Sequence, residues 1–203
     1  MTKIQLPKRN DVHVILDNGH GVNTPGKRSP VWTDGSQLFE YEFNRAIVGL
    51  IAEELTHFNI GFTILVKSEK DMPLRQRADI ANNIYANHIF GISVHSNAGG
   101  GTGSEFYTTP GNTLSDKMAT IIGEEYQAEF PNHKLRTDYS DNDSDKEARF
   151  YILMKTKMPF VLTENFFMDN QLECRKILMT QSGRRRIADF HIRAIIRIIN
   201  EIY

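Results

Sequence analysis

Cysteine is nearly absent from this sequence: the 203 residues include one, Cys174. A single cysteine excludes an internal disulfide framework and a cysteine-rich zinc module, because each of these needs several cysteines. Cys174 lies in a helical pattern over 169–179, so we expect a small, partly buried side chain rather than a nucleophile. Any metal site in this chain must therefore be built from histidine and carboxylate ligands.

A large net charge is also missing, since 24 Lys+Arg and 25 Asp+Glu leave a formal charge of −1. Such a balance disfavours general binding to nucleic acid. No apolar run approaches the ~20 residues that a membrane span requires, so we expect no membrane partner. The N-terminus lacks the apolar stretch of a secretory signal. We therefore expect a protein kept in the cytoplasm, one that leaves by another route, or one whose export signal has been removed.

Linkers, repeats and low-complexity tracts are absent, and strand and helix patterns alternate along the chain. We expect a single domain over 1–203, with 1–11 as an N-terminal extension. The expected strands are 12–17, 61–67, 89–95, 103–109 and 158–165, and the expected helices are 36–57, 113–130 and two that begin near 73 and 183. This alternation predicts a three-layer α/β fold, with helices on both faces of a mixed, mostly parallel, twisted sheet.

Three local features refine this expectation. The 103–109 strand follows its predecessor too closely for a helical crossover, so we expect it to be antiparallel. Asp34 and Gln37 have the spacing of an N-cap and its reciprocal partner at the start of the 36–57 helix. The polar, charged segment 131–147 predicts a long surface loop.

Residues suited to metal chemistry end three of the expected strands. His20 follows the first strand, His95 ends the third, and Glu164 lies at the end of the last. In open α/β sheets, ligands bind beyond the carboxyl ends of the strands. One such residue alone is more often structural, but three at the same sheet edge indicate a shared site. Gly19 and Gly21 beside His20 also permit close backbone approach to a ligand, so we predict a metal site, with zinc as the ion.

A zinc site with two imidazoles needs a third protein ligand, and a catalytic site keeps the fourth position open. Glu40 and Glu42, near the start of the 36–57 helix, are the candidates. Two positions along a helix differ by ~200°, so only one of the pair can face the site. We favour Glu40, which borders the apolar stripe of the helix, although helix geometry alone leaves Glu42 open. Glu164 is then the candidate general base.

Five sequence motifs follow one another along the chain: LDNGHGVNTPG (16–26), EYEFN (40–44), PLRQRADIAN (73–82), SVHSNA (93–98) and KMPFVLTENFFMDN (157–170). In this order they resemble the motifs of the zinc-dependent N-acetylmuramoyl-L-alanine amidases of the AmiC/CwlV type, also called amidase family 3. The resemblance extends over roughly residues 12–203. Two features depart from the family pattern: Phe166 replaces the usual glycine, and the 131–147 loop exceeds the minimum length.

The resemblance implies a hydrolase with one Zn²⁺ per chain and a phosphorylase/hydrolase-like, zinc exopeptidase-like fold. It assigns the metal ligands as His20, Glu40 and His95, and the catalytic base as Glu164. The reaction that it implies is cleavage of the amide between N-acetylmuramic acid and L-alanine of the peptidoglycan stem peptide, in cell wall catabolism, remodelling or lysis.

Peptidoglycan is then the expected partner, and we expect a monomer. Arg77, Asn97 and Arg149 are the residues that we expect to contact substrate. Two biological settings remain open: a phage or prophage lysin held in the cytoplasm until release, and a periplasmic or extracellular enzyme whose signal has been removed. Two alternative functions also remain: a zinc peptidase acting on ordinary peptides, and a non-catalytic peptidoglycan-binding module.

Overall fold

The computed structural model describes residues 6–139 and 144–203. The strands are β1 (Val12–Asp17), β2 (Gly61–Ile64), β3 (His88–Asn97), β4 (Glu105–Thr108), β5 (Lys146–Glu147) and β6 (Phe160–Phe167). The helices are α1 (Glu40–His57), α2 (Leu74–Asn82), α3 (Leu114–Glu129), α4 (Tyr151–Lys155), α5 (Gln171–Glu173), the π-helix η1 (Cys174–Leu178) and α6 (Gln181–Glu201). Residues 1–5 of the expected N-terminal extension and 140–143 of the expected loop lie outside the described residues.

The strands form one mixed sheet in the order β2-β1-β3-β6-β4-β5. The first four strands in this order are parallel to one another. Strand β4 runs antiparallel to β6, and β5 pairs with β4 in parallel. The antiparallel orientation predicted for the strand after β3 is therefore confirmed, because the short connection from β3 to β4 leaves no room for a crossover helix.

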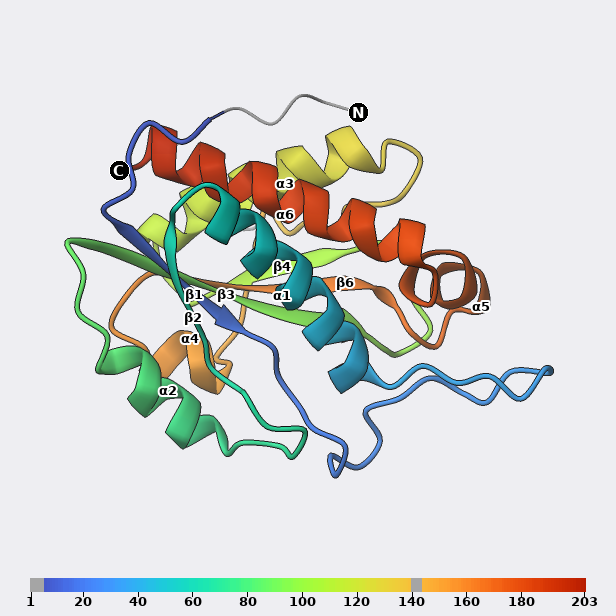
Figure 1. Cartoon of the computed structure of the whole chain (residues 1–203). Helices are drawn as coiled ribbons and strands as arrows, with labels where there is room; N and C mark the ends of the chain where they lie inside the picture. The colour runs from blue at the N-terminus through green and yellow to red at the C-terminus, as the bar shows by residue number, and fades with distance from the viewer. Residues whose placement is uncertain (1–5, 140–143) are drawn as a thin grey trace.

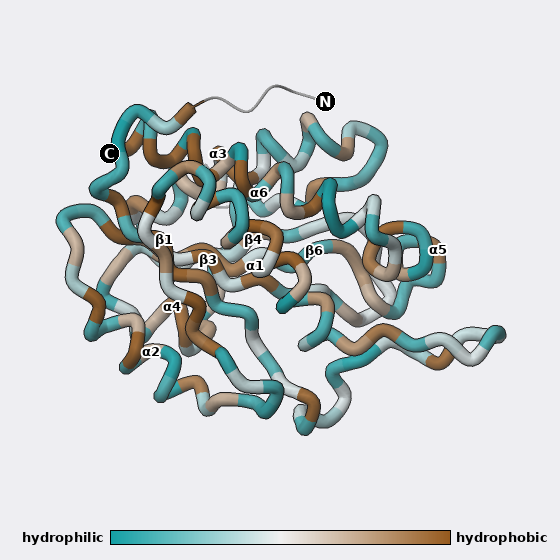
Figure 2. Tube along the Cα trace, viewed as in Figure 1, coloured by the Kyte–Doolittle hydropathy of each residue, from teal (hydrophilic) through white to brown (hydrophobic). Residues whose placement is uncertain are grey.

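Helices cover both faces of the sheet, as the sequence predicts (Figure 1). On one face, Val14 and Leu16 of β1 contribute to a core with α1, α3 and α6, and on the other, Ile15 joins α2 and α4. In Figure 2 the hydrophobic segments concentrate along the central strands, and hydrophilic residues predominate on the outer turns. Among the described residues, no helix combines the length and the apolar character needed to span a bilayer.

The start of α1 differs from the sequence prediction, because the helix begins at Glu40 and not at 36. Asp34 caps a local turn by accepting hydrogen bonds from Ser36, and Gln37 donates to a backbone carbonyl instead of completing a capping box. An isolated bridge between Arg28 and Phe39 holds the preceding segment in an extended conformation. Because of the Arg28–Phe39 bridge, the helix begins four residues later than predicted, and Glu40 lies in its first turn.

Two further segments differ from the sequence prediction. The helical pattern over 169–179 divides into α5 and the π-helix η1. Cys174 opens η1 and is fully buried, where partial burial was expected. The segment 131–147 is not loop throughout, because its end forms the edge strand β5. The first difference leaves the sheet unchanged, and the second adds a short edge strand to it.

Phe166, at the position where the resembled family has glycine, lies in the left-handed region with φ +57°. Its ring is fully buried and packs against Tyr126 and Phe130. We expect Phe166→Ala to lower the free energy of unfolding by about 3–5 kcal/mol through lost packing. Phe166→Gly is expected to be about 1 kcal/mol more stable than the alanine variant, because glycine accepts this φ without strain. Urea denaturation of both variants measures the difference, and an alanine variant at least as stable as the glycine variant would contradict it.

Candidate metal and catalytic site

His20 lies in the loop that follows β1, with its backbone in the left-handed region at φ +64°. Two side chains of α1 hold this loop: Asn44 Nδ2 donates to the Gly19 carbonyl at 3.2 Å, and Arg45 Nη2 donates to the His20 carbonyl at 3.1 Å. A non-glycine residue in this conformation is strained by about 1–3 kcal/mol and persists where the surroundings fix it. The contacts with α1 therefore fix the direction of the imidazole.

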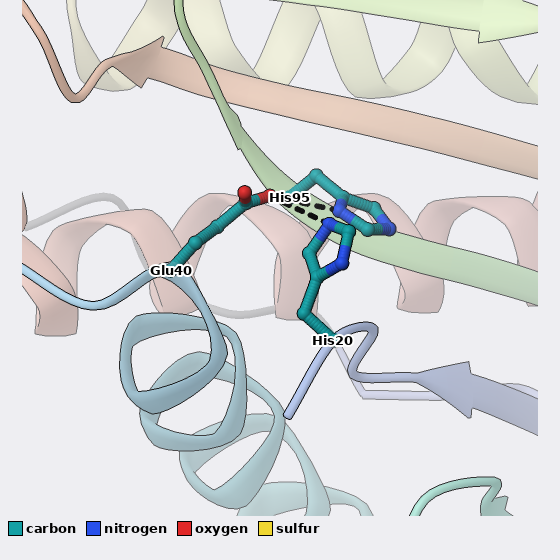
Figure 3. A group of neighbouring side chains, drawn as sticks. All are labelled: His20, Glu40 and His95. Carbon is teal, nitrogen blue, oxygen red and sulfur yellow. Dashed lines mark hydrogen bonds and ion pairs between the residues drawn. The ribbon is translucent and has the colours of Figure 1, made fainter. Parts of the chain in front are cut away.

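Glu40 points its carboxylate toward both histidines, whose rings lie next to each other (Figure 3). Glu40 Oε1 lies 2.9 Å from His95 Nδ1 and 3.4 Å from His20 Nε2. The backbone N–H of Ser96 also donates to Oε1, at 3.3 Å. Glu40 is fully buried and His95 is nearly so. Three residues from α1, β3 and the loop after β1 thus converge on one point.

The three side chains form a group that could hold a metal ion, since their ligand atoms lie within 4.8 Å of one another. Two of the buried atoms at this point, His20 Nε2 and Glu40 Oε2, have no hydrogen-bond partner among the described residues. Buried polar atoms without partners are costly, so their presence here is consistent with a bound ion. Two imidazoles and one carboxylate are a donor set that suits zinc and leaves a coordination position open. The residues present therefore fit a zinc site.

Electrostatic coupling within the group keeps Glu40 ionised. Burial would raise the pKa of Glu40, but the close polar contact with His20, the hydrogen bond with His95 and the charges of both histidines outweigh burial and hold it far below its usual range. Burial lowers the pKa of His20. Burial also acts to lower the pKa of His95, but its hydrogen bond with Glu40 outweighs this effect and the pKa rises. Glu40 thus supplies the negative charge of the group.

Glu164, on β6, pairs in register with His95 on the neighbouring strand β3. Residues paired in this way point to the same face of the sheet, about 5 Å apart. Asn165 fixes this pairing from the other face, because its Nδ2 donates to the His95 carbonyl at 2.9 Å. Glu164 Oε2 is buried without a hydrogen-bond partner among the described residues, and burial raises the pKa of Glu164 to about 7. The arrangement places a carboxyl group that titrates near neutrality beside the His20, Glu40 and His95 group.

The structure brings Glu40, and not Glu42, to the two histidines. The side chain of Glu42 is 54% exposed and pairs with Arg184 of α6 at 3.2 Å. Helix geometry left both glutamates open, and of the two only Glu40 lies where it could join the histidines in holding a metal ion. Lys27 also approaches this group, with its Nζ 3.6 Å from Glu40 Oε2.

Arg77 is nearly fully buried on α2. Its guanidinium donates to Asp71 at 2.5 Å and to the Met72 carbonyl at 2.9 Å, and it lies 3.4 Å from Asp17. An arginine has five N–H donors, and these three partners use three of them. Arg77 thus braces the strand and loops around His20, and the substrate contact expected of it stays a prediction.

The other two residues expected to bind substrate lie in different surroundings. Asn97, at the end of β3, donates from Nδ2 to Glu105 Oε2 at 3.0 Å. Arg149 is exposed, between β5 and α4. The sequence analysis did not identify Glu105, although its register pairing with Glu164 places it at the same sheet edge. The only signal for it in the sequence is a charged residue within a short apolar strand.

Gly19 has no room for a side chain, because a Cβ there would lie 2.4 Å from His95 Cε1 and 2.7 Å from Nε2. We expect Gly19→Ala to displace the His95 ring and to weaken zinc binding by about 10- to 100-fold, as losses of supporting contacts do at metal sites. Competition with a chromophoric chelator measures this affinity.

Gly49→Ala in α1 is the matched control, since a Cβ at Gly49 meets nothing within 4 Å. The control is expected to stabilise the helix by about 0.5–1 kcal/mol and to leave zinc affinity unchanged. Equal zinc affinity in the Gly19→Ala and Gly49→Ala variants would show that the His95 ring tolerates the added methyl group.

Comparison with known proteins gives matches over most of this chain. A family model described as N-acetylmuramoyl-L-alanine amidase matches residues 14–197. The sporulation-specific N-acetylmuramoyl-L-alanine amidase of Bacillus subtilis (strain 168) is 32% identical over 193 residues, which cover 93% of this chain and 69% of that protein. The endolysin of Bacillus phage SPP1 is 29% identical over 192 residues, which cover 92% of this chain and 66% of that protein.

A solved structure of similar fold is the N-acetylmuramoyl-L-alanine amidase from Clostridium difficile 630. It has a TM-score of 0.80 at 22% identity and covers 95% of this chain and 99% of that one. The family match includes His20, Glu40, His95 and Glu164, which all lie within residues 14–197. The chain therefore belongs to the N-acetylmuramoyl-L-alanine amidase family.

Proposed function

We propose that this chain is a zinc-dependent hydrolase that cleaves the amide between N-acetylmuramic acid and L-alanine of the peptidoglycan stem peptide. The observation that carries the proposal is the group of His20, Glu40 and His95 beside Glu164. Membership of the amidase family supports the same reaction. We also propose that residues 1–203 form one catalytic domain, with 1–11 as an N-terminal extension, and that it acts as a monomer.

His20, Glu40 and His95 hold the ion in this proposal, and Glu40 contributes the anionic ligand. When bound, zinc polarises a carbonyl group and acidifies water at neutral pH. Glu164 accepts the proton that the attacking water loses as its oxygen bonds to the carbonyl carbon. It returns this proton to the alanine nitrogen as the C–N bond breaks, which leaves a lactyl carboxylic acid and a free amine. The second proton of the water, still on the new carboxyl group, then passes to the amine and gives a carboxylate and an ammonium group. A carboxyl group with a pKa near neutrality suits both transfers.

Zinc-dependent release of stem peptides from purified sacculi tests the proposed function. We expect new alanine amino groups to appear in the presence of the protein, to be lost after chelation and to return with one equivalent of zinc. An N-acylated peptide that begins with alanine but lacks muramic acid is the matched substrate control. Equal cleavage of that peptide would replace the amidase proposal with a general zinc peptidase. Binding to sacculi without any release would indicate a non-catalytic binding module.

A further inference from the structure

Four side chains gather on the carboxylate of Glu105, one strand beyond Glu164. Tyr107 donates its hydroxyl to Oε2 at 2.5 Å and Asn97 donates to the same oxygen at 3.0 Å. Arg136 Nε and Lys146 Nζ donate to Oε1, the latter at 3.0 Å. We call these five residues the Glu105 cluster. Glu105 is only 4% exposed, so it acts as a buried anchor for the two cations.

The Glu105 cluster continues the row of residues that forms the metal and catalytic site. His95 on β3 pairs in register with Glu164 on β6, which pairs with Glu105 on β4. Tyr107 of β4 pairs in turn with Lys146 on β5. Neighbouring strands lie about 4.8 Å apart, so the anchor lies ~10 Å from His95 on the same face of the sheet. A substrate bound at the metal could therefore reach the cluster without leaving this face.

The cluster carries more positive than negative charge. Two cations share the single carboxylate of Glu105, which leaves a formal excess of one positive charge. The side chain of Arg136 is 33% exposed and that of Lys146 is 24% exposed, so both reach solvent. Arg136 lies over the ring of Phe167 at 5.4 Å, and only its Nε donates a hydrogen bond among the described residues. A guanidinium offers five donors, of which the bond from Nε to Glu105 uses one.

The substrate of the proposed function has anions on one side of the scissile bond only, and the present inference rests on that function. The glycan side offers hydroxyl and acetamido groups, and its lactyl carboxyl group is part of the amide that is cut. Free carboxylates belong to the stem peptide. An extended peptide spans about 3.3–3.6 Å per residue, so ~10 Å is reached within the first two residues beyond the alanine.

We infer that Arg136 and Lys146, anchored by Glu105, form a subsite for a free carboxylate of the stem peptide, within two residues of the alanine. Arginine forms paired hydrogen bonds with carboxylates, and the neighbouring ammonium adds a second charge. The subsite selects acidic stem peptides over amidated ones. It also orients the peptide so that the alanine nitrogen faces Glu164.

Synthetic muramoyl peptides test this selection, in pairs that carry a carboxylate or its primary amide on the second or third residue. Wild-type protein is expected to show a kcat/KM about 10- to 100-fold higher on one of the acids than on its amide, mainly through KM. This preference should shrink as salt rises, because Arg136 and Lys146 are partly exposed. In the double variant Arg136→Gln/Lys146→Gln the acid-to-amide ratio is expected to fall toward one.

Arg186→Gln is the matched control. Arg186 also pairs with a glutamate, Glu129, and also lies over a phenylalanine ring, that of Phe130 at 4.2 Å. It belongs to α6 on the other face of the sheet, so its replacement should keep the acid-to-amide ratio. A double variant that slows on acid and amide alike, with an unchanged ratio, would mean that the cluster is only structural.

The wild-type protein alone also decides between the two proposals. Cleavage of neither peptide would defeat the proposed function. Equal cleavage of acid and amide in every pair would defeat the subsite and leave the amidase activity standing. This comparison does not depend on whether the double variant folds.

Discussion

Replacing Glu164 by glutamine is expected to lower kcat/KM on muramoyl peptides by about 10³-fold, within the 10²- to 10⁴-fold range of general acid–base catalysis. Glutamine keeps the size of the side chain but can neither accept the proton of the attacking water nor return it to the leaving nitrogen. Glu164 lies beside His95 in the sheet register but is not part of the group of three ligands. Zinc affinity is therefore expected to stay within about tenfold of the wild-type value.

Zinc binding and turnover are measured separately, so that loss of proton transfer can be distinguished from loss of the metal. Chelator competition gives the zinc affinity of the variant, and peptide release at saturating zinc gives its activity. Loss of both together would mean that Glu164 supports the metal rather than the proton transfer. Activity within tenfold of wild type, with zinc bound, would remove Glu164 from the mechanism.

The sheet was predictable because its central strands β1, β3 and β6 are buried on both faces and because strands alternate with amphipathic helices along most of the chain. Such strands give short apolar runs, and β1 is the clearest case (Val12–Asp17). The start of α1 was not predictable from capping rules, since the bridge between Arg28 and Phe39 is a contact that local spacing does not encode. The division of 169–179 into α5 and η1 was not predictable either, because the apolar pattern of a helix persists through the segment while the spacing of its backbone hydrogen bonds changes.

Some residues of the site were likewise predictable from local sequence patterns, and others were not. His20, His95 and Glu164 stand at strand ends, and the topology of a parallel sheet brings such residues to one edge. Glu40 belongs to a helix, so its selection over Glu42 required either the family spacing or the structure. The Glu105 cluster could not be predicted, because it draws on β3, β4, β5 and the segment after α3. No local pattern indicates that a polar segment supplies two cations to a buried carboxylate.

Replacing Glu40 by glutamine is expected to weaken zinc binding by more than about 100-fold and to abolish peptide release at micromolar zinc. Substitutions that only support a ligand cost 10- to 100-fold in metal affinity, so the loss of an anionic ligand should cost more. Glutamine removes the only carboxylate of the three-residue group and leaves two imidazoles with no charge to balance the ion. Isothermal titration with zinc, checked by chelator competition, measures the change.

Glu42→Gln is the matched control for this experiment, because it makes the same chemical change two positions along the same helix. Glu42 is largely exposed, and its pair with Arg184 contributes at most about 1 kcal/mol to stability. Zinc affinity and activity should both match the wild-type values in this variant. The two substitutions together separate a ligand from a surface charge: tight zinc binding in Glu40→Gln, or its loss in Glu42→Gln, would overturn the ligand set. If Glu40→Gln alone loses the ion, the first turn of α1 supplies the third ligand. The start of α1 at Glu40, and not at 36, then has a function, because it places the Glu40 carboxylate beside the two histidines.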